Sequence, residues 1–172
     1  MADERPRLSL LHQREIEAQI VGPLIRAVMA ELGEEKTLRL VRGVIEDLAR
    51  QSGAELARQL GEASLEAFAQ ELGRWCEGGA LEIEMLEKSP ERLAFNVTRC
   101  RYAEMYRALG LGDLGSSLSC QRDFSLVEGF NPSIHLTRTQ TLMQGAPHCD
   151  FRFEATPPSK TASDPSKPPA LG

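Results

Sequence analysis

The stretch Leu81-Glu82-Ile83-Glu84-Met85 decides the fold class, because apolar and acidic residues alternate along it. Alternation with a period of two is typical of a β-strand that has one buried and one solvated face. After a turn at Lys88-Ser89-Pro90-Glu91, the residues Leu93, Phe95 and Val97 alternate in the same way. We therefore predict a β-hairpin that begins directly after residue 80, where the pattern of the chain changes.

Three stripes of apolar residues at helical spacing precede this hairpin, and each predicts an amphipathic helix. In chain order they are Ile16, Ile20, Leu24 and Val28; Leu38, Val41, Ile45 and Leu48; and Leu65, Phe68, Leu72 and Trp75. We expect Gly33 to end the first helical stretch, and Gly22-Pro23 to kink it or divide it into two helices. The stripes are predicted to build a helical layer over the core. The alternative is a partner-binding surface, which would make the protein a homodimer.

Helices and strands alternate after the hairpin. One helix is expected from Tyr102 to Leu109, capped by Gly110, and a second from about Leu114 to Val127. A Thr-rich strand is expected over Ile134–Met143, and a turn then leads into a last strand, Cys149–Glu154.

These elements predict one α+β domain over residues 1–155. Its N-terminal helical layer packs on a C-terminal antiparallel sheet, formed by residues 81–99 and 134–154, with interleaved helices. The last 17 residues, 156–172, hold five of the ten prolines, with Ser and Lys between them. Such a composition buries too little apolar surface to offset its ordering entropy, so this tail is predicted to be disordered.

Composition excludes several classes of protein. The net charge of −5 and the absence of a Lys/Arg cluster argue against a nucleic-acid partner. No apolar run approaches the roughly 20 residues needed to cross a bilayer, and residues 1–7 are charged where an export signal would be apolar. We therefore expect a cytoplasmic protein without a membrane partner, whose four cysteines are free thiols, ligands or nucleophiles.

Cys100 is the first candidate for a reactive residue, because it lies where a predicted strand ends and a helix begins. The amide groups at a helix N-terminus favour a thiolate, and Arg99 and Arg101 flank the cysteine with positive charge. Glu104 follows one turn later, so the two side chains would form a nucleophile and a proton carrier. The alternative is a small buried thiol beside a solvated helix.

A second pair, Cys120 and Asp123, is also one turn apart. Asp123 lies beside an apolar stripe, which is unusual for a carboxylate unless it is paired or functional; the alternative is an exposed Asp and a core Cys. In the strand predicted from Ile134, Arg138 and Gln140 share the apolar face. A buried arginine needs an anionic partner, which would be Asp123, Glu104 or the carboxylate of a substrate.

Cys149 is expected to point into the core from the last strand, so three cysteines from separate elements would converge. Separations of 20 and 29 residues match no zinc-knuckle spacing, and the chain has no C-x-x-C motif. A metal ion held by Cys100, Cys120, Cys149 and His148 stays open as an alternative to a site without metal.

Several segments of this region resemble one family in order. They are Thr98–Tyr106 followed by Leu109-Gly110, Leu118–Phe124, Gly129–Pro132, Leu136–Thr141 and Gly145–Arg152. This pattern, which covers about a third of the chain, is similar to the signatures of the L-2-amino-thiazoline-4-carboxylate hydrolase family.

The resemblance implies hydrolytic opening of a cyclic isothiourea or amidine to give N-carbamoyl-L-cysteine. It supports the membership of these residues in one site, and their roles are assigned by chemistry. We expect Cys100, Glu104 and Asp123 to be catalytic, and no cofactor unless the cysteines hold a metal ion. The residues expected to bind the substrate are Arg138, Cys120, Cys149, Arg101, Asn131 and Gln140. The same segment is more loosely similar to vinyl-4-reductase-type ligand-binding domains, which supplies the rival function of a small-molecule, metal or haem sensor without turnover.

Overall fold

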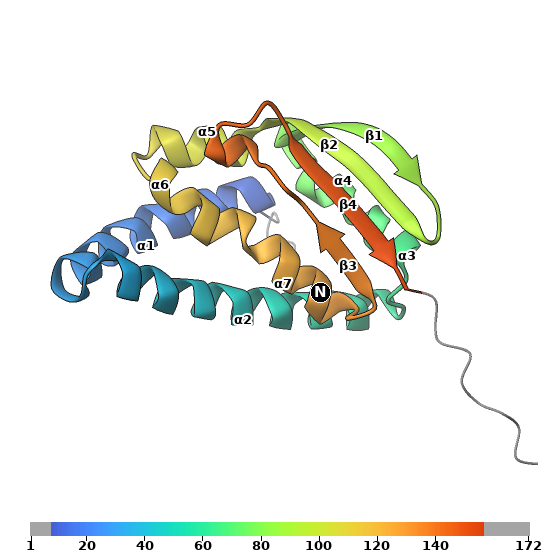
Figure 1. Cartoon of the computed structure of the whole chain (residues 1–172), viewed down its shortest axis with the longest axis horizontal. Helices are drawn as coiled ribbons and strands as arrows, with labels where there is room; N and C mark the ends of the chain where they lie inside the picture. The colour runs from blue at the N-terminus through green and yellow to red at the C-terminus, as the bar shows by residue number, and fades with distance from the viewer. Residues whose placement is uncertain (1–7, 157–172) are drawn as a thin grey trace, which may run out of the picture.

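A computed structural model of the chain describes residues 8–156 and confirms the α+β fold class. The two long helices α1 (Leu10–Leu32) and α2 (Glu34–Leu60) lie on one side of the molecule and the antiparallel sheet on the other (Figure 1). The disorder predicted for the tail concerns residues that, apart from Thr156, lie outside this range. Within residues 8–156, no helix has the length and apolar character of a membrane span.

The first helix is one element rather than two, because α1 continues through Pro23. Gly22 before it is buried, and a Cβ at this position would lie 2.6 Å from the Cδ1 atom of Leu111, so the glycine is needed for close packing. Gly33 ends the helix as predicted. Its φ of 82° is left-handed, and its N–H donates to the carbonyl of Met29 at 2.9 Å.

The first apolar stripe does not cover the core, and this part of the prediction is wrong. Its four members on α1 are between 41% and 62% exposed, whereas Ala18, Gly22 and Ile25 on the opposite face are buried. Small residues allow that inner face to approach its neighbours closely, which leaves the larger side chains outside. On α2, Leu38, Val41 and Ile45 pack against the core as expected, but Leu48 is 48% exposed.

Helix α2 crosses α7 (Arg122–Phe130) at very close range. A Cβ on Gly53 would lie 2.0 Å from the carbonyl oxygen of Leu126, and a Cβ on Gly129 would lie 2.0 Å from that of Arg50. Only glycine fits at both positions, so this contact fixes how α7 is placed against α2.

We expect Gly53→Ala to lower the free energy of unfolding by at least about 1–3 kcal/mol, because the methyl group would force the two helix backbones apart. Gly43→Ala is the matched control in the same helix, since nothing lies within 4 Å of its Cβ position. It should be neutral or stabilise by roughly 0.4–1 kcal/mol. Urea denaturation of both variants measures the difference, and equal stabilities would contradict the tight crossing.

The predicted hairpin is confirmed as β1 (Leu81–Lys88) and β2 (Arg92–Cys100). With β4 (Cys149–Ala155) and β3 (Ile134–Thr137) it forms a four-stranded antiparallel sheet of order β1-β2-β4-β3. Between α2 and the hairpin, the chain forms the short helices α3 (Leu65–Gln70) and α4 (Leu72–Trp75) and the 3₁₀ turn η1 (Glu77–Gly79).

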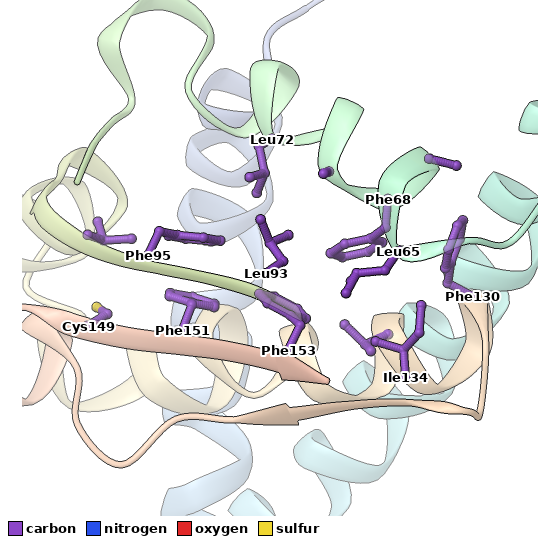
Figure 2. Close-up of a cluster of buried hydrophobic side chains, with 14 residues drawn as sticks. Leu65, Phe68, Leu72, Leu93, Phe95, Phe130, Ile134, Cys149, Phe151 and Phe153 are labelled. Carbon is purple, nitrogen blue, oxygen red and sulfur yellow. The ribbon is translucent and has the colours of Figure 1, made fainter. Parts of the chain in front are cut away.

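Aromatic rings fill the space between the sheet and α3. Phe95 and Phe151 are paired across β2 and β4 and stack with ring centroids 5.0 Å apart, while Phe68 of α3 packs on Phe153 at 5.3 Å (Figure 2). Cys149 lies at one end of this cluster and is buried, so its predicted inward direction is confirmed.

The strand predicted over Ile134–Met143 is too long, because β3 stops at Thr137. The side chain of Asp150 replaces the partner strand here. It accepts the backbone N–H groups of Thr139 and Gln140, both at 2.9 Å, and the hydroxyl of Thr139 at 2.6 Å. The chain then forms the 3₁₀ turn η3 (Leu142–Gln144) before β4. Arg138 and Gln140 therefore do not share the face of a strand.

The helix expected after Tyr102 is α5 (Arg101–Ala108), and Gly110 follows it at a left-handed φ of 70°. The next predicted helix exists in three parts, α6 (Gly112–Gly115), the π-helical turn η2 (Ser116–Cys120) and α7. A π turn inserts an extra residue into a helix and is often found at functional sites. Here it carries Cys120.

Candidate functional site

The buried apolar residues form two cores. The first surrounds Phe95, Phe151 and Phe153, the second surrounds Ala18, Tyr106 and Leu114, and three cysteines pack against one or both of them. Cys100 caps the N-terminus of α5, where its Sγ accepts the N–H of Ala103 at 3.4 Å, and it packs against both cores. The Sγ of Cys149 accepts the N–H of Leu142 at 3.2 Å. Cys120 packs against the second core, and its electrostatic neighbours include both other thiols.

The thiol of Cys100 is protonated at neutral pH, contrary to the predicted thiolate. Burial raises its pKa from 9.0 to about 11 and outweighs the amide groups of Ala103 and Tyr102, which lower it. Burial also raises the pKa of Cys120, to about 12. Ionisation of Cys100 therefore needs a base or a bound cation.

The same pKa predicts how slowly Cys100 reacts with iodoacetamide. At pH 8 a thiol of pKa 9 is ionised to about one part in ten and one of pKa 11 to about one in a thousand, so Cys100 should react about 100-fold more slowly in the folded than in the unfolded protein. The rate should rise steeply towards pH 10, because the ionised fraction grows there. Peptide mass spectrometry of the Cys100 peptide measures it. Equal rates at pH 8 in buffer and in urea would contradict the raised pKa.

Asp123 and Arg138 form an ion pair beside these cysteines. One guanidinium nitrogen of Arg138 donates to Oδ2 of Asp123 at 2.5 Å and the other to the carbonyl oxygen of Cys120 at 2.8 Å. The guanidinium lies 4.9 Å from the ring centroids of both Phe124 and Phe151. Its side chain is only 4% exposed, against 25% for Asp123. Arg138 is thus held between two aromatic rings and fixes the carboxylate of Asp123.

Burial raises the pKa of Asp123 above its ordinary value, although Arg138 acts in the opposite direction. The carboxylate in turn raises the pKa of both Cys100 and Cys120, so its charge reaches both thiols. A carboxyl group whose pKa is moved towards neutrality, next to a protonated thiol, is suited to accept and return a proton.

Glu104 and Arg101 are not brought to the cysteines. Glu104 accepts two hydrogen bonds from Arg99, at 2.8 and 3.2 Å, and this exposed pair lowers its pKa. Arg101 donates to the carbonyl oxygen of Gly78 at 2.9 Å. Both residues instead line an open surface pocket of about 250 Å³ between α1 and α5. The other lining residues are Leu11, Glu15, Met105, Ala108 and Leu109.

Asn131 and Gln140 hold backbone segments in place. Asn131 ends α7, and its side chain donates to the carbonyl of Ala63 at 2.7 Å. The Gln140 side chain lies 3.0 Å from Nε2 of His148 and donates to the carbonyl oxygen of the same residue at 3.2 Å. Among residues 8–156, no three side chains of His, Cys, Asp or Glu form a group that could hold a metal ion.

Two arginines and two tyrosines near this site are not among the site residues predicted from the sequence. Arg122 begins α7, burial lowers its pKa, and Arg14 of α1 lowers it further. Burial raises the pKa of Tyr102 and of Tyr106 to about 12. Their helical spacing in α5 was visible, but nothing local indicated that α1 would bring Arg14 to them.

The family model of L-2-amino-thiazoline-4-carboxylic acid hydrolase matches residues 13–153, which include every residue of the cysteine cluster and the ion pair. The chain belongs to this hydrolase family. No curated protein matches the chain.

Two solved structures resemble this member of the hydrolase family in fold. One is the phenol-responsive sensory domain of the transcription activator PoxR with phenol, with 16% identity and a TM-score of 0.50 over 80% of this chain and 74% of that chain. Another is trafficking protein particle complex subunit 3 from Naegleria fowleri, covalently bound to palmitic acid. It is 9% identical, with a TM-score of 0.50 over 84% of this chain and 96% of its own. At these identities the likeness shows the fold alone.

Proposed function

We propose that this protein hydrolyses a cyclic isothiourea or amidine carboxylate, such as L-2-amino-thiazoline-4-carboxylate, at the site formed by Cys100, Asp123 and Arg138. The observation that carries the proposal is the buried Asp123–Arg138 pair, whose carboxylate acts on the pKa of Cys100 within the segment matched by the hydrolase family. Membership of the family supports the reaction class, and the division of roles among the residues is our own.

In the proposed reaction, the sulfur of Cys100 attacks the ring carbon that lies between nitrogen and sulfur, and Asp123 accepts the thiol proton. The ring C–S bond then breaks, and the departing sulfur takes that proton and becomes a free thiol. An isothiourea-like adduct is left on Cys100. Water adds to the same carbon, again losing a proton to Asp123, and Cys100 leaves as its thiol. The product is N-carbamoyl-L-cysteine.

The raised pKa of Cys100 fits this sequence of steps, because the resting thiol is protected until a substrate arrives. A protonated amidine beside the sulfur would favour the thiolate, as any nearby cation does. Arg138 keeps Asp123 in position. We propose that the substrate carboxylate binds to the remaining N–H groups of Arg138 and to Arg122. Arg122 makes no hydrogen bond within the described part of the chain, and its charge lowers the pKa of Asp123.

A ligand-binding sensor without turnover is the second candidate function. The observation that favours it is the resting state itself, in which the thiols of Cys100 and Cys120 are protonated and Arg138 already has two partners. In that case the same interior site would bind a small molecule and release it unchanged.

Incubation of the purified protein with a panel of thiazoline and cyclic amidine carboxylates separates the two functions. We expect release of one thiol per molecule of thiazoline consumed, with N-carbamoyl-L-cysteine as product. Binding of a panel member, detected by calorimetry, without any release of thiol would overturn the hydrolase and support the sensor. The release of thiol in buffer without protein sets the background rate.

A further inference from the structure

The exposed apolar side chains of this protein are concentrated on its two long helices. Among residues 8–156, eight of the eleven large apolar residues with high exposure belong to α1 and α2. We call these eight residues the outer face: Ile16, Ile20, Leu24, Val28, Leu32, Leu40, Val44 and Leu48. Scattered apolar residues are common on protein surfaces, but a contiguous patch indicates an interaction site.

The outer face consists of two stripes on consecutive helices. Within each helix its members recur every four residues, so they form one stripe along α1 and one along α2. The two helices are consecutive, meet at the turn at Gly33 and diverge beyond it (Figure 1). The buried residues of α1, Ala18, Gly22 and Ile25, lie on the opposite side of the helix, so the stripe is turned away from the interior.

The charges of the two helices argue against an anionic membrane as the partner of this face. Together α1 and α2 carry seven basic and eight acidic residues, which is a net charge of −1. Helices that bind to anionic membrane surfaces are rich in Lys and Arg on their polar side. Charges of both signs are instead suited to a protein partner.

The stripe of α2 is self-complementary. Leu40 and Leu48 lie four residues before and after Val44, so a two-fold axis at Val44 places each leucine of one chain against the other leucine of a second chain. Both ends of α2 carry charges of both signs, Glu35 and Lys36 before the stripe and Glu55 and Arg58 beyond it, so an antiparallel pair can match opposite charges. A standard interface buries roughly 800 Å² per partner. The eight side chains are each 41% to 62% exposed and would supply the apolar part of such an area.

We propose that the protein is a two-fold symmetric homodimer in which the outer faces of α1 and α2 pack against each other, with Val44 at the axis. Pairing also holds α1 in place from outside. The inner face of α1 contributes Ala18 and Ile25 to the core that Cys100 borders, so the dimer would stabilise the packing beside Cys100.

Size-exclusion chromatography with light scattering on the full chain at micromolar concentration tests the proposal. We expect twice the 19.0 kDa of one chain. Val44→Glu places two like charges at the axis and should weaken dimerisation by about 100-fold or more, which leaves a folded monomer. Leu86→Glu is the matched control, because Leu86 is 50% exposed on β1, away from the outer face. It should remain a dimer.

Circular dichroism shows whether the variants keep their fold. Val44→Cys gives a second readout, which does not depend on a loss of dimerisation. Under mild oxidation it should form a disulfide-linked dimer, whereas Leu86→Cys should not. A wild-type monomer at these concentrations, or a Val44→Glu variant that remains dimeric, would overturn the proposal. So would a monomeric wild type that sediments with phosphatidylserine vesicles when Val44→Glu does not, because the face would then bind membranes.

Discussion

Arg138→Met is expected to lower the free energy of unfolding by about 3–5 kcal/mol, because it leaves the carboxylate of Asp123 buried without its partner. It also removes the hydrogen bond to the carbonyl of Cys120 and the stacking on Phe124 and Phe151. Urea denaturation of the folded variant measures the loss.

The double variant Arg138→Met/Asp123→Leu is the control for this effect. It removes both charges and keeps the apolar contacts, so most of the lost stability should return. Arg50 provides a comparison at the surface, since its pair with Glu128 is exposed and Arg50→Met should cost no more than about 1 kcal/mol. A similarly small effect of Arg138→Met would show that the Asp123–Arg138 pair is not a buried one.

The second large effect is expected on turnover. Cys100→Ala should lower kcat by about 10² or more, and Asp123→Asn by about 10²–10⁴, because each removes a group that forms or breaks a bond in the proposed reaction. Initial rates of thiol release with L-2-amino-thiazoline-4-carboxylate measure both.

Glu104→Gln is the matched control, because Glu104 lies one turn from Cys100 but is exposed and paired with Arg99. Its turnover should equal that of the wild type. Normal turnover by Cys100→Ala, with its fold intact, would remove Cys100 from the mechanism. Asp123 would then remain as the group that activates water directly. A large loss in Glu104→Gln would move the reaction to the surface pocket beside Arg101.

The local sequence pattern predicted the structure correctly wherever that structure depends on a single helix or strand. The alternation from Leu81 predicted β1, and the position of Cys100 between strand and helix predicted that it caps α5. The direction of Cys149 followed from the two-residue period of its strand. In each case the residues that determine the structure are neighbours in the chain.

Prediction failed where distant segments meet. Periodicity showed that α1 is amphipathic, but only the close approach of Gly22 to Leu111 decides which face is buried. The end of β3 depends on Asp150, which lies more than ten residues further along the chain and captures the backbone of Thr139.

The site was predictable only in part for the same reason. Three partners were open for Arg138, and the structure pairs it with Asp123. The thiolate expected for Cys100 rested on the helix N-terminus and the flanking arginines. The packing of two cores around the sulfur, which raises its pKa, is not visible in the sequence. Arg99 is occupied by Glu104 and Glu82 at the surface.

Labelling with 2-chloroacetamidine tests most directly whether hydrolysis takes place at Cys100. This reagent carries an amidine next to an alkylating carbon, so it should bind as the substrate does and modify the cysteine that attacks the ring. We predict that peptide mass spectrometry finds the label on Cys100. The fraction of thiol-releasing activity that is lost should equal the fraction of Cys100 that is labelled, and the thiazoline substrate should protect against both labelling and loss of activity. Full activity with Cys100 completely labelled, or loss of activity with the label on Cys76 alone, would contradict the account.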